Sequence, residues 1–190
     1  MSNFLRDKWT FWYDKPDPEM CVENWDQFLI RMGTFQKLED LWGLLNNISS
    51  LTILPTGSNF HLFKKGIEPK WEDFQNQDGG KWILELPKLE FSKLEKIWKK
   101  SILLVVGTEL NKKESELING IVISARKEHH RISIWTKYSS YKELQLSIGE
   151  KWKKIIQEEG FTNSLSLEYL SHKMIPLKNY KETKDKSEFQ

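Results

Sequence analysis

Two arginines and a tryptophan are spaced so that one face of a β-hairpin would present all three. Alternating apolar residues predict strands over Ile118–Arg126 and Arg131–Thr136, joined by a four-residue loop. Such a loop places Arg126 directly opposite Arg131, and the period of two then puts Trp135 on the same face. Guanidinium groups bind anions and an indole ring offers a stacking surface. The pattern therefore predicts either an anion clamp beside an aromatic floor or a solvated sheet face beside the core.

Two further tryptophans stand in polar sequence. Trp25 and Trp71 lie outside every apolar run, in segments that predict loops. A loop tryptophan is either exposed for binding or folded back into the core, and the pattern leaves both readings open. Glu72 directly follows Trp71, and a carboxylate beside an indole can accept two hydrogen bonds from the edge of a stacked guanine.

Composition limits the classes of function. The 190 residues, 38% of them hydrophobic, suffice for a single domain over residues 1–190. With 29 Lys plus Arg against 27 Asp plus Glu, the net charge of +2 excludes broad binding to a phosphate backbone, so any RNA contact must be local. Cys21 is the only cysteine, which excludes a disulfide framework. The first residues resemble no signal peptide and no run spans a bilayer, so we expect a soluble intracellular protein.

Catalytic and metal sites are not predicted. His129 and His130 follow Glu128, but adjacent histidines on a hairpin loop point to different sides, which favours an exposed polar turn over a metal site. Gly79 and Gly80 lack the strand and helix context of a phosphate-binding loop. No acidic cluster suited to metal-assisted hydrolysis is apparent. We therefore expect no cofactor, and an enzyme is the weaker hypothesis.

The elements that must position these residues follow from hydrophobic periodicity. Predicted helices cover Thr34–Ile48, Ser92–Gly107 and Tyr141–Ile156. Besides the hairpin, predicted strands cover Trp9–Tyr13, Phe60–Lys64, Lys81–Leu86 and Ser164–Leu170. Asn111–Glu116 reads as a loop, and residues 1–8 and 177–190 as flexible ends. Short strands with turns between them predict an α+β fold with an antiparallel sheet and helices on one face.

One predicted helix and one predicted strand carry side chains that are candidates for binding as well as side chains for the core. The apolar arc of the Thr34–Ile48 helix, which runs from Leu44 round to Phe35, is wider than one core contact needs. Leu38 and Trp42 lie toward its margin, so that they form either a partner surface or extra core packing. In the Lys81–Leu86 strand, Lys81, Ile83 and Glu85 share the side opposite the larger apolar residues.

Tryptophans recur in a set of spaced motifs. These are Trp9-x-x-Trp12-Tyr13, Trp25, Leu38-Glu39-Asp40-Leu41-Trp42, the run Leu62–Asp73, Gly79-Gly80-Lys81-Trp82, Ile97-Trp98, Gly120-x-Val122 and Ile132-x-Ile134-Trp135-Thr136. Together, from about Trp9 to His172, they resemble the eukaryotic translation initiation factor 4E family. The resemblance implies a curved antiparallel sheet with three helices on its convex face and a cap-binding concave side.

The resemblance also implies a ligand, the 7-methylguanosine cap of messenger RNA, with 7-methyl-GTP or 7-methyl-GDP as analogues. Trp25 and Trp71 would sandwich the base, Glu72 would accept hydrogen bonds from its N1 and N2 groups, and Trp135 would lie against the N7 methyl group. Three basic residues match the phosphate contacts of the family: Arg126, Arg131 and Lys81. Glu128 stands where relatives often place a further base, so somewhat weaker phosphate binding is expected.

The family also has a partner surface. The resemblance implies that the convex side around Leu38, Trp42 and Gly107 receives a Tyr-x-x-x-x-Leu-hydrophobic helix from the initiation scaffold or from inhibitory proteins. Lys100 stands where relatives commonly carry an acid, and no His-Pro precedes Trp9, so an altered partner preference is expected. A monomer in the cytoplasm, with the nucleus as a further compartment, fits this family. A repressive cap-binding paralogue and a less specific single-strand RNA binder remain alternatives.

Overall fold

A computed structural model describes residues 4–21, 24–48, 51, 54–87, 91–161 and 166–174. Its strands are β1 (Phe4–Asp14), β2 (Ile30–Lys37), β3 (Asn59–Lys64), β4 (Gly80–Pro87), β5 (Ile118–Ala125), β6 (His129–Thr136) and β7 (Leu167–Ser171). Its helices are α1 (Leu38–Asn47), α2 (Phe91–Val106), α3 (Lys112–Leu117) and α4 (Lys142–Glu158), with 3-10 turns η1 (Trp25–Phe28) and η4 (His172–Met174).

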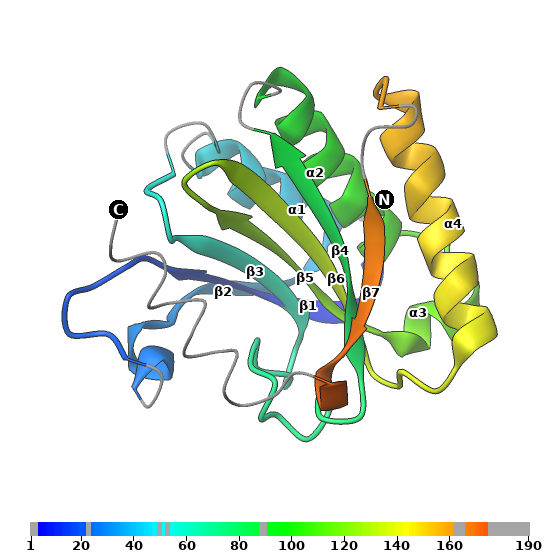
Figure 1. Cartoon of the computed structure of the whole chain (residues 1–190), viewed down its shortest axis with the longest axis horizontal. Coiled ribbons are helices and arrows are strands. Elements are labelled where there is room, and N and C mark those ends of the chain that lie inside the picture. Colours follow the sequence, from blue (N-terminus) through cyan, green and yellow to red (C-terminus); the bar gives the residue numbers. More distant parts are fainter. Residues whose placement is uncertain are drawn as a thin grey trace.

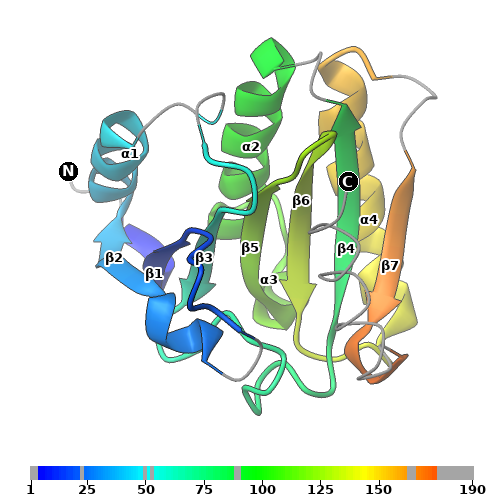
Figure 2. The same cartoon turned by 60° about the vertical axis from the view of Figure 1, so that its left-hand side comes forward.

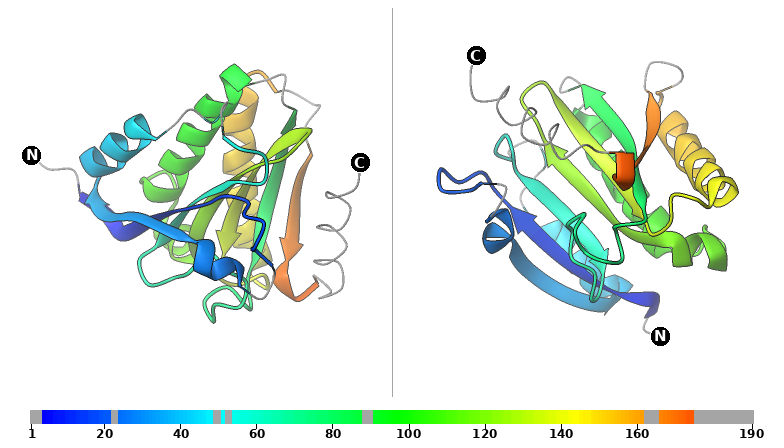
Figure 3. Two further views of the ribbon diagram at one scale, coloured as in Figure 1. Left: turned by 90° about the vertical axis from the view of Figure 1, so that its left-hand side faces the viewer. Right: turned by 60° about the horizontal axis from the view of Figure 1, so that its bottom comes forward.

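The strands form one antiparallel sheet in the order β2-β1-β3-β5-β6-β4-β7. The sheet is curved, and α1, α2 and α4 cover the same side of it, as Figure 1 and Figure 3 show. We call this side the convex face and the opposite side the concave face. The predicted α+β class, with an antiparallel sheet and three helices on one face, is confirmed.

Strand register assigns each side chain to a face. Ile121 pairs with Ile134, and Ile123 pairs with Ile132, all buried under the helices. The alternate positions, among them Val122 beside Ser133, therefore point to the concave face. The apolar core thus lies between sheet and helices, and the polar side chains of the central strands gather on the other side.

The turn of the β5–β6 hairpin differs from the expected four-residue loop. Arg131 pairs with Ser124, and the backbone N–H of Arg126 donates to the carbonyl of His129 at 3.0 Å, so only Lys127 and Glu128 form the turn. The expected pairing of Arg126 opposite Arg131 is wrong by two positions. Because a shift of two is even, every side chain keeps its predicted face.

The histidines of this hairpin also differ from expectation. Strand β6 begins at His129, and His130 is only 4% exposed because it faces the core opposite Leu86. The predicted exposed turn is therefore wrong for His130. The two histidines do point to different sides, as alternation in a strand requires.

The first helix begins later than predicted. Thr34–Lys37 belong to β2, and α1 starts at Leu38. Phe35 is buried opposite Trp9, and the Thr34 hydroxyl lies 2.9 Å from that of Thr10, so pairing with β1 outweighs the helical spacing. The wide arc that included Phe35 is thus shared between a strand and a helix.

The segment predicted as a loop over Asn111–Glu116 forms the short helix α3. Asn111 caps it: its side chain accepts from the backbone N–H of Glu114 at 3.0 Å, and the Glu114 carboxylate accepts from the N–H of Asn111 at 2.7 Å. This reciprocal capping box was missed because the segment is so charged.

The ends of the chain are described only in part. β1 begins at Phe4, so residues 4–8, expected to be flexible, belong to a strand. Residues 1–3 and the tail 177–190 lie outside the described residues, as do 162–165 at the start of the predicted last strand. No helix of the described part is long and apolar enough to span a membrane.

Candidate functional site

The loop between β3 and β4 carries Trp71 and is held from inside by Asn76. The Asn76 side chain is fully buried, and its Nδ2 donates to the carbonyls of Glu68 at 2.9 Å and Lys70 at 2.8 Å. Its Oδ1 accepts from Nδ2 of Asn119 on β5 at 2.9 Å. These hydrogen bonds hold the backbone of the loop in place and do not involve the Trp71 side chain. Trp71 is 37% exposed.

Trp25 lies on η1, in a loop that contacts the Trp71 loop. The carboxylate of Asp26 is 3.9 Å from Nζ of Lys70, which also pairs with Glu68 at 2.6 Å. Figure 2 shows η1 and the β3–β4 loop at the same end of the sheet. Neither Trp25 nor Trp71 belongs to the hydrophobic core, so the alternative in which these side chains fold back into the core is wrong. The residues beside the two tryptophans therefore bring their loops together.

Two neighbouring acids on the β3–β4 loop have different roles. The Asp73 carboxylate accepts backbone N–H groups from Glu68 at 2.9 Å and Gln75 at 2.8 Å, so it is used inside the loop. Glu72 is exposed, and its backbone carbonyl is held by Nε2 of Gln77 at 2.9 Å. Of these two acids, Asp73 is used inside the loop, whereas Glu72 is exposed to solvent.

Trp135 forms a floor on the concave face. Its ring packs edge-on against Phe63, with centroids 5.6 Å apart, and lies 4.5 Å from the ring of His172. Behind it, Gly120 leaves no room for a side chain, because an added Cβ would come within 2.5 Å of the Phe63 ring. Trp135 is half-buried, so it is fixed on one side and keeps exposed surface on the other.

The three predicted phosphate-binding cations share the concave face. Nζ of Lys81 is 5.3 Å from the centroid of the Trp135 ring, which lies opposite it in register. Nη2 of Arg126 donates to Oδ1 of Asn59 at 3.1 Å. Arg131 donates from Nε and Nη2 to one oxygen of Glu85, at 3.1 and 2.5 Å.

Burial and mutual repulsion make the charged form of Lys81 costly in this cluster of cations. Burial, together with the charges of Arg131 and Arg126, lowers the pKa of Lys81 to about 8. Burial also lowers the pKa of His172 to about 4, so its ring is neutral at pH 7, and its Nδ1 lies 2.7 Å from the carbonyl of Asn76. A bound phosphate would relieve the repulsion between these cations.

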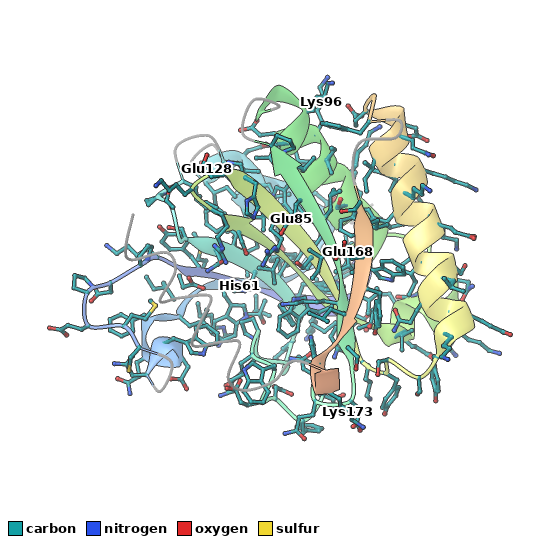
Figure 4. All side chains as sticks on the ribbon, viewed as in Figure 1. His61, Glu85, Lys96, Glu128, Glu168 and Lys173 are labelled. Atoms are coloured by element: carbon teal, nitrogen blue, oxygen red, sulfur yellow. The ribbon has the colours of Figure 1, made fainter. Side chains whose placement is uncertain are left out.

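Several contributors were not identified from the sequence. The buried amides of Asn76 and Asn119 have no local pattern that signals them. Glu85 was placed on the side of Lys81 by alternation, but its contact with Arg131 was not foreseen. The same concave face carries a buried pair, Asp14 and His61; Figure 4 labels His61 and Glu85.

The predicted partner residues lie on the convex side. Leu38 and Trp42 on α1 are partly buried and pack against the core, so each keeps exposed surface. Gly107 follows α2 and donates its N–H to the carbonyl of Leu103 at 2.8 Å. Lys100 on α2 pairs with two acids at the end of α4, Glu159 at 2.7 Å and Glu158 at 3.3 Å.

Within the described ranges, no group of three or more His, Cys, Asp or Glu side chains is placed to hold a metal ion. The polar groups of the concave face include cations, amides and carboxylates. Such a set can bind an anion and a planar base.

Comparison with known proteins places these features in a family. The model described as eukaryotic initiation factor 4E matches residues 4–187. The eukaryotic translation initiation factor 4E of Candida albicans is 37% identical over 170 residues, which cover 88% of this chain and 78% of the relative. The translation initiation factor isoform 4E of Nicotiana tabacum is 38% identical over 160 residues, covering 84% and 78%.

Solved structures agree. A complex of C. elegans eIF4E-3 with the 4E-binding protein Mextli and a cap analogue has a TM-score of 0.82 and 29% identity, covering 91% of this chain and 94% of that one. Ascaris suum eIF4E-3 in complex with the m7G cap has a TM-score of 0.83 and 29% identity, covering 93% and 96%.

Proposed function

The chain belongs to the eukaryotic initiation factor 4E family, and on that ground we propose that it binds the 7-methylguanosine cap of messenger RNA on its concave face. The observation that carries the proposal is the contact between the Trp25 and Trp71 loops through Asp26 and Lys70, with both tryptophans outside the core. Solved relatives with a cap or cap analogue bound support it.

In this proposal each group has a distinct role. The rings of Trp25 and Trp71 sandwich the methylated base. The exposed Glu72 carboxylate accepts from the guanine N1 and N2 groups, and the Trp71 backbone N–H donates to O6. Trp135, held by Phe63, lies against the N7 methyl group.

Selectivity for the methylated base follows from charge. Methylation at N7 makes the base cationic, and each indole face attracts a cation by ~0.5 to 2 kcal/mol. Two faces therefore favour the methylated over the unmethylated base roughly tenfold to thousandfold. Arg126, Arg131 and Lys81 bind the phosphates that follow. Glu128, exposed on the hairpin turn, weakens this contact somewhat by repulsion.

Quenching of tryptophan fluorescence by 7-methyl-GTP and by GTP tests the cap site. Trp25→Ala, Trp71→Ala and Glu72→Ala should each abolish most binding of the methylated nucleotide while the folded circular-dichroism spectrum is kept. Phe74→Ala is the matched control, because Phe74 is the most exposed aromatic of the same loop, at 74%, and has no assigned role. Equal affinity for the two nucleotides would instead identify a less specific RNA binder.

We also propose that a protein partner binds the convex side through a helical Tyr-x-x-x-x-Leu-hydrophobic segment. The surface that receives it consists of Leu38 and Trp42 on α1, Lys100 on α2 and Gly107 after α2. The relative solved with a 4E-binding protein supports this assignment. Lys100, which pairs with Glu158 and Glu159, stands where relatives commonly carry an acid, so partners with a basic residue opposite this position should bind less well.

A peptide of that form, titrated by calorimetry, tests the partner surface. Trp42→Ala should weaken binding at least tenfold, whereas Asp40→Ala, at an exposed position on the opposite face of the same helix, should leave it unchanged. Equal binding to the Trp42 variant would contradict the proposed partner surface but would not affect the proposed cap site.

The proposed role is recruitment of capped messages to the initiation scaffold in the cytoplasm, by binding and without catalysis. Prolonged incubation with capped RNA should yield no cleaved product. Addition of the protein to a cap-dependent translation extract depleted of its own cap-binding factor should restore synthesis. Repression of that extract would favour the repressive paralogue.

A further inference from the structure

A carboxylate lies inside the predicted phosphate site. Glu85 shares the concave side of β4 with Lys81 and sits opposite Arg131 in register. One oxygen of Glu85 accepts from both Nε and Nη2 of Arg131, at 3.1 and 2.5 Å. Figure 4 shows Glu85 on the sheet face away from the helices. Arg131, one of the three cations expected to bind phosphate, is therefore already paired with a carboxylate of the protein.

This carboxylate is charged at neutral pH. The hydrogen bonds from Arg131 hold the pKa of Glu85 below its ordinary value. Nε2 of His129 lies 3.5 Å from the same Glu85 oxygen. A phosphate that approaches Arg131 must therefore displace Glu85 or bind beside it, and repulsion between the two anions opposes both.

The position of the pair along the strand indicates which phosphates are affected. Lys81 lies directly opposite Trp135, whereas Arg131 is four residues along β6 from Trp135, which is roughly 13 Å at the rise of a strand. A phosphate chain attached to a base beside Trp135 meets Lys81 first and Arg131 farther along. Glu85 thus competes with the phosphates that are more distant from the base.

We infer that Glu85 is a specificity-determining residue. Its ion pair with Arg131 competes with phosphate, and so makes the affinity for a cap depend more on the base and less on the number of phosphates. This inference rests on the proposed cap-binding function. Glu85 acts through Arg131 and does not itself read the base. Neutralising it should make Arg131 available to the distal phosphates.

The test measures affinity for 7-methylguanosine, 7-methyl-GMP and 7-methyl-GTP in the full chain, with Glu85→Gln as the variant. Glutamine keeps the size and an acceptor oxygen for Arg131 but removes the charge. We expect affinity for 7-methyl-GTP to rise roughly three- to tenfold, because a partly exposed ion pair of this kind is weak and anion repulsion is also removed. The gain should be smaller for the monophosphate and absent for the nucleoside, and 7-methyl-GTP binding should become more sensitive to salt.

Two controls separate this effect from simpler ones. Glu168→Gln makes the same change of charge on the same face, one strand away, where Glu168 pairs with Ile83 in register. An equal gain from that variant would mean that only the overall charge of the face matters, and would overturn the role of the Glu85–Arg131 contact. In an Arg131→Ala background, Glu85→Gln should give a clearly smaller gain; an undiminished gain would also overturn it.

Failure of the inference differs from failure of the proposed function. If the wild-type chain binds 7-methyl-GTP no better than GTP, the cap-binding proposal itself fails. If the wild type prefers the methylated nucleotide but Glu85→Gln has unchanged affinity for 7-methyl-GTP, only the role given to Glu85 is wrong.

Discussion

Nε2 of His61 lies 2.6 Å from Oδ2 of Asp14, and both side chains are buried on the concave face. The second carboxylate oxygen of Asp14 accepts from Nδ2 of Asn59 at 2.7 Å, and Oδ1 of Asn59 accepts from Arg126 at 3.1 Å. A chain of hydrogen bonds therefore runs from β1 through β3 to the β5–β6 turn. It ties a predicted phosphate ligand to the interior of the sheet.

Asp14→Ala should destabilise the fold by about 2 to 4 kcal/mol, because Nε2 of the buried His61 ring loses its partner and the Asn59 amide loses the shorter of its two hydrogen bonds as donor. Urea unfolding followed by fluorescence measures this change. Asp40→Ala, at an exposed position in the first turn of α1, is the control and should cost less than about 1 kcal/mol. Equal losses for the two variants would show that the buried pair contributes nothing special.

Asn76→Ala should loosen the loop that carries Trp71, because it removes donors to Glu68 and Lys70 and the acceptor for Asn119. We expect a loss of about 2 to 3 kcal/mol in stability and a clear loss of affinity for 7-methyl-GTP, although Asn76 is buried away from any ligand. Gln77→Ala, which removes one exposed amide contact of the same loop, should have a much smaller effect on both. Unchanged affinity in the Asn76 variant would mean that the loop keeps its shape without this amide.

Lys81→Met should stabilise the folded protein at pH 7, because a buried cation beside two arginines destabilises the fold. The same change should weaken 7-methyl-GTP binding roughly tenfold, because it removes a cation that binds phosphate. The folded-state pKa of about 8 lies below the ordinary 10.5, so the unfolded chain binds more protons between these values. Wild-type stability therefore gains from Lys81 deprotonation as pH rises through that window. The stabilisation by Lys81→Met should thus be largest below pH 8 and shrink toward pH 10.

Urea unfolding of both proteins at pH 7 and pH 9.5 checks this prediction. Lys154→Met, at an exposed position on α4, removes the same charge from the helix side and should show neither effect. A stability difference that is constant across pH would contradict the assigned pKa of Lys81.

Gly120→Ala should disturb the floor of the site, because the new Cβ would lie 2.5 Å from the Phe63 ring against which Trp135 packs. Overpacking of this kind costs about 1 to 3 kcal/mol, and displacement of Trp135 should lower affinity for the methylated base. Gly33→Ala on β2 is the matched control, since an added Cβ there meets nothing within 4 Å. Thermal unfolding and nucleotide titration of the two variants distinguish a local clash from a general effect of alanine.

Local patterns were sufficient for much of this protein. The period of two in β4 to β6 predicted which side chains share the concave face, and an even register shift could not change that. The helical spacing of α2 and α4 predicted both elements, and the polar surroundings of Trp25 and Trp71 marked them as candidates for binding without deciding whether the rings pack into the core. The spaced tryptophans then identified the family.

Contacts between distant segments could not be obtained in this way. Arg131 meets Glu85 across 46 positions of sequence, His61 meets Asp14 across 47, and Asn119 meets Asn76 across 43. The first two contacts depend on the strand order and on the register at which strands pair, and the third depends on how the β3–β4 loop folds against β5. The period of a strand gives its face but not its neighbour. The sequence by itself therefore determined the faces of the central strands, the positions of α2 and α4 and the family. Only the tertiary structure decided which charge lies against which, because that requires the sheet to be assembled.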